Sequence, residues 1–350
     1  MPGESAREIF VVALKDGRAT RTDAAEPTDL LAPLLGADIG WVNVEVDDLA
    51  VEGERVAAAL GFPVGMVQAL LHPETASYDD RDTELGFLVP MIRVDGMKVT
   101  TENLVMILRG NFVVTMYQRG RVTRFRKFAR YAETALRKLK HDSTTQDKLT
   151  ILVTRLLNEN NERNFDGIRP IEDNGERLSG ELVKENADRK RVAQEIYQMK
   201  RALIAYLDAL WSSLDVIHYL RHGDAELISD EEPLLARVAI LGDDVHRHIN
   251  LSEHMSEVLS SGLEVMQGIY NNQLTALNNR MAFIVTWLTV LGTAVLVPNT
   301  LATVISAAPI ELHIEDPLLY IAVMGGSTVL ATGLAWIWVR RRVPLGRKLD

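Results

Sequence analysis

The chain has 350 residues, of which 47% are hydrophobic and 25% charged, and its formal net charge is −10. This length suffices for two or three structural units, and the acidic balance argues against a nucleic-acid role while it suits a protein that attracts cations. Cysteine is absent, which excludes disulfides and thiolate metal sites and fits a reducing compartment.

The first part of the chain combines short β-type runs with turn residues. Four apolar runs have the length and residue types of strands, at 41–46, 86–92, 104–108 and 112–116. Helix-like segments lie around Val56–Leu60 and Met66–Leu71. We therefore expect residues 1–123 to form an α+β domain. Because no basic start followed by an apolar run is visible at Met1, we expect no cleaved signal and a cytoplasmic location for this domain.

Residues 124–232 change to long, charged patterns of helical period, which predict antiparallel helices. Their apolar positions form two stripes: Leu149, Leu152, Val153, Leu156 and Leu157 in the first, and Ile196, Met199, Leu203, Tyr206 and Leu210 in the second. Such stripes are typical of helices that pack on one face.

From Pro233 onward nothing breaks the helical pattern, and residues 233–280 are predicted to form the cytoplasmic part of a long stalk helix. Its apolar residues follow at steps of three and four: Met255, Leu259, Leu263, Met266, Tyr270, Leu274, Leu277 and Met281. A helix from residue 233 to about residue 306 would be about 110 Å long at ~1.5 Å per residue. Because an exposed helix of that length is improbable alone, we interpret this seam as packing against copies of itself around an axis.

Two stretches near the C-terminus lack charge. No Asp, Glu, Lys or Arg occurs between Arg280 and Glu311, or between Asp316 and Arg340, and each gap exceeds the roughly 20 residues that cross a bilayer. We expect transmembrane helices at 281–308 and 317–339, joined by an outer loop at 309–316. The tail 340–350 is basic whereas the loop is acidic, so the positive-inside rule places both termini in the cytoplasm and the hairpin in the cell membrane.

One face of the first expected span is polar. At about 100° per residue, six side chains fall within roughly a third of the helix circumference: Asn279, Thr286, Thr289, Thr293, Thr300 and Thr303. A cation pathway needs such oxygen groups on one face, so we predict that these residues line a pore. The alternative is that the threonines pack helices together, with their hydroxyls bonded to backbone carbonyls.

The outer loop carries only acidic charge, from Glu311, Glu315 and Asp316. Repeated around a ring, these carboxylates would concentrate cations at the mouth of a pore. They could equally be solvated residues beside a membrane span. No Gly-rich phosphate loop, nucleophile elbow or His-Glu-x-x-His motif occurs, so enzyme activity is not expected.

Several short segments, taken with their order along the chain, resemble those of a known family. They are Leu71-His72-Pro73-Glu74, Asn111-Phe112-Val113-Val114-Thr115, Met199-Lys200-Arg201 with Trp211, Asn278-Asn279-Arg280-Met281 before Leu288-Thr289, and Pro298-Asn299-Thr300-Leu301. Together they resemble the CorA family of magnesium transporters over almost the whole chain. The resemblance implies a CorA-like funnel, a homopentamer in membrane lipid, and passive transport of Mg²⁺ or another divalent cation.

The resemblance also implies that the transported cation regulates the channel. In the family, divalent ions held between carboxylates of neighbouring subunits close the channel. Matched residue by residue, the two carboxylates are Asp95 of the soluble domain and Asp244 of the long helix. Carboxylate oxygens are hard ligands that suit Mg²⁺, and Asp243 is a near substitute for Asp244. The alternative is that these acidic residues form a solvated surface.

One departure from the family concerns selectivity. The family's Gly-Met-Asn triplet, which forms the outer selectivity ring, is absent here. Its position falls on Ala307-Ala308-Pro309 when the proline of the span is matched to Pro298, and on Thr303-Val304-Ile305 when the chain is matched without gaps from Asn279. Two functions therefore stay open: a divalent-cation channel of weak selectivity, and a non-conducting pentameric scaffold or ion sensor of the same fold.

Overall fold

The computed structural model describes residues 7–72, 77–120, 125–182, 188–222, 225–307 and 317–342. The chain divides into two compact units, Met1–Glu264 and Val265–Asp350.

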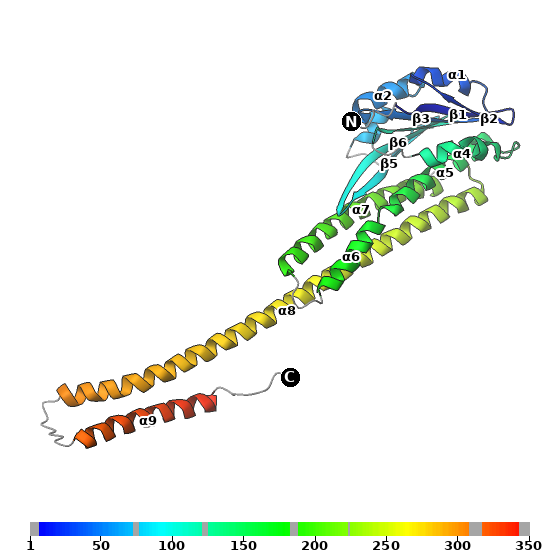
Figure 1. Cartoon of the computed structure of the whole chain (residues 1–350). Helices are drawn as coiled ribbons and strands as arrows, with labels where there is room; N and C mark the ends of the chain where they lie inside the picture. The colour runs from blue at the N-terminus through cyan, green and yellow to red at the C-terminus, as the bar shows by residue number, and fades with distance from the viewer. Residues whose placement is uncertain are drawn as a thin grey trace. The chain divides into compact units, whose positions relative to one another are not determined.

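Within the described residues, the first unit is built on a seven-stranded sheet of order β2-β1-β3-β7-β6-β5-β4 (Figure 1). The strands are β1 (Ile9–Lys15), β2 (Arg18–Asp23), β3 (Ile39–Val46), β4 (Tyr78–Asp80), β5 (Glu84–Asp95), β6 (Lys98–Arg109) and β7 (Phe112–Gln118). β3 and β7 pair in parallel, and the other neighbouring strands pair antiparallel. The sheet is therefore mixed, as expected of an α+β domain whose parallel pair is joined by crossover segments.

Helices cover both faces of this sheet. η1 (Pro27–Leu30), α1 (Leu31–Leu34), α2 (Leu49–Ala59) and α3 (Met66–Leu71) pack on one face, and α4 (Arg126–Arg137), α5 (Thr145–Asp166) and α7 (Arg189–His222) on the other (Figure 1). Since both faces are covered, β3 is buried at every position instead of alternating. Trp41 anchors the α4 side, where its ring packs edge-on against Phe10, Phe125 and Phe128.

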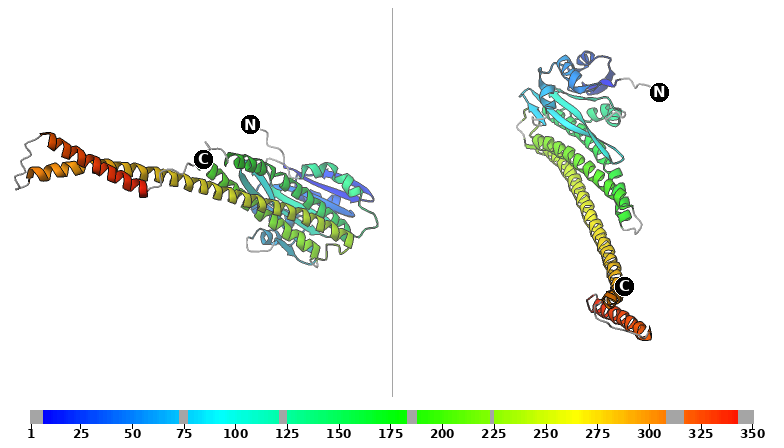
Figure 2. Two further views of the ribbon diagram at one scale, coloured as in Figure 1. Left: turned by 90° about the horizontal axis from the view of Figure 1, so that it is seen from below. Right: turned by 90° about the vertical axis from the view of Figure 1, so that its left-hand side faces the viewer.

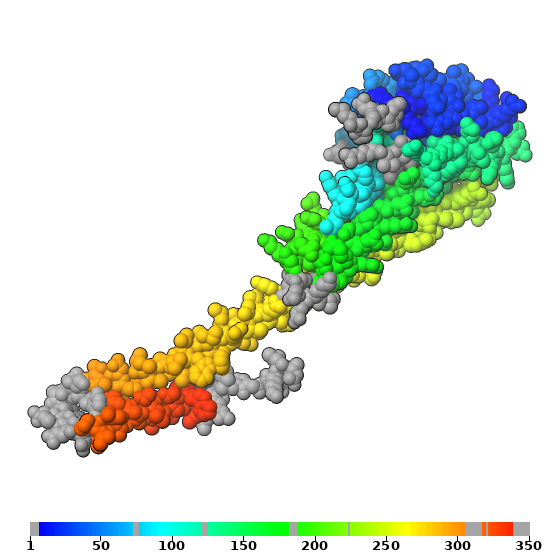
Figure 3. All heavy atoms as spheres, in the orientation of Figure 1, coloured from blue at the N-terminus to red at the C-terminus, as the bar shows by residue number. Residues whose placement is uncertain are grey.

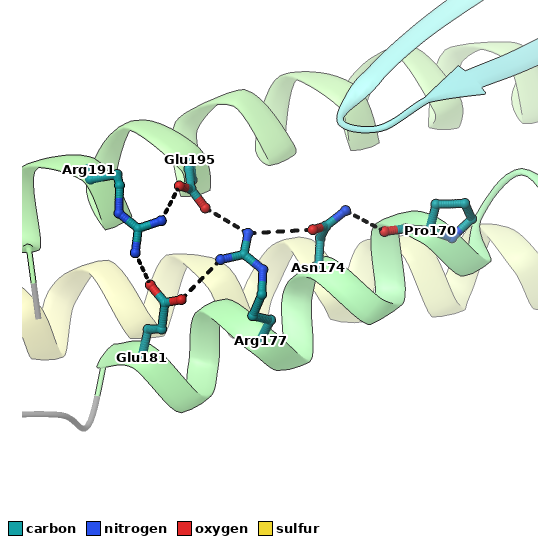
Figure 4. A network of polar contacts seen from close by, with 6 residues as sticks. All are labelled: Pro170, Asn174, Arg177, Glu181, Arg191 and Glu195. Carbon is teal, nitrogen blue, oxygen red and sulfur yellow. Dashed lines mark hydrogen bonds and ion pairs between the residues drawn. The ribbon is translucent and has the colours of Figure 1, made fainter.

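A closed ring of four charges joins α6 (Arg169–Leu182) to α7 (Figure 4). Arg177 pairs with Glu181 at 3.1 Å and Glu195 at 2.7 Å, and Arg191 pairs with the same two carboxylates at 2.6 and 2.9 Å. The hydrogen bond from Arg177 holds the pKa of Glu195 below its ordinary value. Because partly exposed pairs contribute only about 0–1 kcal/mol each, the ring fixes how α6 lies on α7 more than it stabilises the fold.

The apolar seam predicted to contact other copies lies on the helix α8 (Glu232–Ala307), and part of it packs within the chain instead. Leu259 is buried in an apolar cluster with Ile171 and Ile196, and Met255 and Leu263 pack partly against the same cluster. The prediction that the seam contacts other copies is therefore wrong for Leu259, because α6 and α7 supply its partners within the chain. Met255 and Leu263 are half-exposed. Further along α8, the seam residues Tyr270, Leu274, Leu277 and Met281 are exposed. Figure 3 draws the atoms of this stretch of α8 in yellow to orange.

The second unit contains the C-terminal part of α8 and the helix α9 (Pro317–Arg342), which runs beside it (Figures 1 and 2). Both helices contain a window long and apolar enough to cross a membrane. Among the described residues of this unit, only Val290 and Ala331 are buried, while side chains such as Val295 and Leu296 are exposed. So much apolar surface is unusual for a protein in water and fits contact with lipid or with further helices.

Candidate ion pathway and cation sites

The threonines of α8 share one local hydrogen-bond geometry. Each hydroxyl donates to the backbone carbonyl four residues earlier: Thr286 to Ala282 at 2.8 Å, Thr289 to Val285 at 2.9 Å, Thr293 to Thr289 at 2.9 Å, Thr300 to Leu296 at 2.7 Å, and Thr303 to Asn299 at 2.8 Å. The helix thus satisfies every one of these hydroxyl donors within an apolar segment. A hydroxyl that donates still has lone pairs to offer, so these oxygens keep the capacity to face a cation.

Burial separates the predicted stripe into two parts. Thr286 and Thr293 are half-buried, on the face of α8 that also carries Val290, which is 6% exposed. Thr289, Thr300 and Thr303 are exposed. One edge of the stripe therefore has protein neighbours within the chain, and the remainder is free for another occupant.

Asn279 and Pro298 mark two further features of this helix. Asn279 is exposed and lies before the uncharged stretch. Pro298 stands inside α8, and because proline has no N–H, the carbonyl of Ala294 loses its donor within the helix. That carbonyl adds a backbone oxygen within the apolar segment. The outer-mouth candidates Glu311, Glu315 and Asp316 lie outside the described residues.

The two candidate cation ligands lie in separate places within one chain. Asp95 is exposed at the end of β5, where Gly96 turns the hairpin with a φ of +61°. Near it, Val94 and Met97 pack against the cluster that contains Leu259. Asp244 lies fifteen residues before Leu259 on α8, about 22 Å along the axis at ~1.5 Å per residue.

One chain therefore does not bring the two carboxylates together, and a shared ion needs a second copy. Among the residues with described positions, no group of three or more His, Asp or Glu side chains is placed to hold a metal. Asp244 instead pairs with Arg247, whose Nη2 lies 2.9 Å from Oδ1. A cation at Asp244 would compete with this guanidinium.

The imidazole of His248 lies one helical turn beyond Asp244. It stacks on Phe165 with ring centroids 3.7 Å apart. Burial and the neighbouring Arg247 lower its pKa, although Asp244 acts in the opposite direction. The ring is therefore neutral at physiological pH and adds no positive charge beside Asp244.

Sequence reasoning missed a cleft beside Asp244. Arg155, Glu159 and Arg237 line it together with Asp244. Their sequence signal is slight, because charges four residues apart, as at Arg155 and Glu159, are common on solvent-facing helices. Only the packing of α4, α5 and α8 shows that these charges line one cleft.

Comparison with known proteins identifies a matching family and structures of the same fold. The family model of the CorA-like Mg²⁺ transporter protein matches residues 36–341. No curated protein matches the chain at a significant level.

Three solved structures share the fold. They are the complete CorA magnesium transporter of Methanocaldococcus jannaschii (TM-score 0.65, 15% identity, 96% of this chain and 98% of that chain), the full-length CmaX protein (TM-score 0.64, 17% identity, 98% and 100%), and the ZntB cytoplasmic domain of Vibrio parahaemolyticus (TM-score 0.54, 12% identity, 77% and 100%). The two full-length structures cover the strands, the long helices and the apolar hairpin together.

Proposed function

Because the chain belongs to the CorA-like family of Mg²⁺ transporters, we propose that it is the subunit of a homopentameric channel through which divalent cations cross the cell membrane passively. The membrane potential would drive each cation inward with about 2.3 kcal/mol per charge per 100 mV. Both termini would lie in the cytoplasm, because basic residues gather after the second span and acidic ones between the spans.

The row of threonine oxygens on α8 carries this proposal. An ion that leaves water for an apolar segment pays a large desolvation cost unless oxygens replace its hydration. Thr289, Thr300 and Thr303 are exposed, and each already has its hydroxyl proton bonded within the helix. In a ring of copies, their lone pairs would face the axis, while Thr286 and Thr293 would lie toward the helices beside them.

The exposed apolar residues of α8 supply the contact between copies. Tyr270, Leu274, Leu277 and Met281 follow one another at helical spacing and have few neighbours within the chain. Burying such residues releases about 25 cal/mol per Å² of apolar surface. A ring around α8 would therefore cover the stretch that the chain itself leaves open.

Flux into liposomes tests the function. Vesicles that contain the purified protein and a Mg²⁺-sensitive dye are compared with protein-free vesicles at a potential that is negative inside. Mg²⁺ should enter the vesicles with protein about tenfold faster. The mass of the detergent-solubilised protein should correspond to five chains. A pentamer without flux would contradict the channel and favour the scaffold or ion sensor, and a monodisperse monomer would contradict both.

We also propose that a divalent cation regulates the channel by bridging Asp95 of one copy to Asp244 of the next. Mg²⁺ touches few carboxylates and keeps most of its water, so two acidic side chains from different copies suffice. Exposed Asp95 and half-exposed Asp244 can each be reached from outside their own chain.

Protection from proteolysis should report this bridge. Mg²⁺ is expected to slow cleavage of the soluble unit about fivefold or more, because a ligand that binds only the assembled state stabilises it. The double variant Asp95→Ala, Asp244→Ala should lose the protection, whereas Asp208→Ala, an exposed carboxylate on α7, should keep it. Arg247→Gln should increase it, since Asp244 is then free of its ion pair. Equal protection of the double variant and the parent protein by Mg²⁺ would contradict the proposed bridge between Asp95 and Asp244.

A further inference from the structure

The cleft beside Asp244 lies among three helices of the first unit. α4, α5 and α8 surround a volume of about 280 Å³, near the lower end of the ~300–1,000 Å³ of small-molecule sites. Aromatic residues of α4 form one side of it, Phe128 and Tyr131. The polar groups come from α5 and α8.

Two arginines line this cleft without an ion-pair partner of their own. Arg155 and Arg237 both line it, and in the part of the chain that the structure describes neither forms an ion pair. The two carboxylates that line the cleft with them have other partners, since Asp244 pairs with Arg247 and Glu159 accepts a hydrogen bond from Tyr131. Arg155 Nη1 donates to the carbonyl of Ala135 at 3.0 Å, which orients the guanidinium. Burial and the nearby Arg237 lower the pKa of Arg155. Two like charges so placed favour an anion, and guanidinium groups suit oxyanions through paired hydrogen bonds.

A buried carboxylate at the same cleft needs a hydrogen-bond donor. Glu159 is only 3% exposed. Its Oε2 accepts a bond from the Tyr131 hydroxyl at 3.2 Å, whereas its Oε1 is buried without a protein partner. A buried acceptor left unpaired destabilises the folded protein, so a ligand that donates to Oε1 would offset that loss.

From these two observations we propose that the cleft binds a phosphate-type oxyanion that keeps a P–OH group. The guanidinium groups of Arg155 and Arg237 would hold its unprotonated oxygens, and its P–OH would donate to Glu159 Oε1. Sulfate is disfavoured, because it has no proton at neutral pH and would set its oxygens against the carboxylate of Glu159.

Discrimination between phosphate and sulfate is the test. The full-length protein in detergent is titrated calorimetrically at neutral pH and constant ionic strength, without divalent cations. Inorganic phosphate should bind saturably, and the affinity for sulfate should be at least about tenfold lower. Glu159→Gln should bring the two anions within about threefold of each other, because the amide offers a donor as well as an acceptor.

The role of Arg237 is tested separately, because this arginine lies on the exposed side of the cleft. Arg237 is exposed, so Arg237→Gln should fold normally and weaken phosphate binding by about tenfold. Arg201→Gln, which removes an exposed arginine of α7 that does not line this cleft, should leave binding unchanged. No phosphate binding by the parent protein, equal affinity for sulfate, or an unchanged affinity in Arg237→Gln would each overturn the proposal, even if Glu159→Gln failed to fold.

Discussion

Replacing Thr289 by valine is expected to lower Mg²⁺ flux through the reconstituted protein by about tenfold or more, which is about 1.4 kcal/mol or more in the barrier. Valine has the shape of threonine but no oxygen, so the change removes a ligand and makes the exposed face of α8 apolar at that level. In a ring of copies, each substitution removes one oxygen per subunit from the same level of the pathway.

Matched variants separate the oxygen from the shape of the side chain. Thr289→Ser keeps the hydroxyl and should retain flux within about threefold of the parent. Thr293→Val should have a smaller effect than Thr289→Val, because Thr293 is half-buried on the face that carries Val290. All three proteins should have the parent's oligomeric mass. Flux in Thr289→Val equal to that of the parent, in an intact oligomer, would show that this face does not line the pathway.

The apolar hairpin and most strands could be predicted from the sequence because their signals are local. A stretch free of charge, as between Arg280 and Glu311, needs no knowledge of its neighbours. The four predicted strand runs all fall within β3, β5, β6 and β7. The family and the fold are likewise confirmed by the match over residues 36–341 and by the two full-length structures.

The first hairpin was missed although its signal was present. β1 and β2 are joined at Asp16 and Gly17, which both have positive φ, of 49° and 73°. Asp-Gly after an apolar run is a strong hairpin signal, and Ile9–Leu14 is such a run. These strands add the edge β2-β1 to the sheet and complete the face on which α4 packs.

The partners of a helix face could not be predicted, because periodicity shows that a face is apolar and not what covers it. The seam of α8 is one example, since Leu259 packs within the chain and Met281 does not. The cleft at Glu159 is another, because its charges come from helices far apart in the sequence. The ion ligands Asp95 and Asp244 depend on a neighbouring copy and stay a proposal.

Selectivity among divalent ions is expected to be weak, because the chain lacks the Gly-Met-Asn triplet. In the family this triplet forms the outer selectivity ring, and here only Glu311, Glu315 and Asp316 are available to attract ions at the mouth. Carboxylates attract by charge, whereas a fitted ring of neutral oxygens discriminates by size and coordination. In the liposome assay, Mg²⁺ and other divalent ions should therefore compete on nearly equal terms. Cobalt hexammine, a rigid mimic of hydrated Mg²⁺, should inhibit poorly.

The salt dependence of flux distinguishes attraction by charge from a fitted site. Changing Glu311, Glu315 and Asp316 together to their amides should lower flux at low ionic strength and matter little at high salt, since exposed charges are screened over about 8–10 Å near physiological ionic strength. The matched control changes Glu226, Asp230 and Glu231, which precede α8 in the first unit, to their amides. Flux should then be unchanged at every salt concentration. Strong Mg²⁺-selective transport that cobalt hexammine blocks would contradict weak selectivity, because some other element of the chain would then have to rebuild the filter.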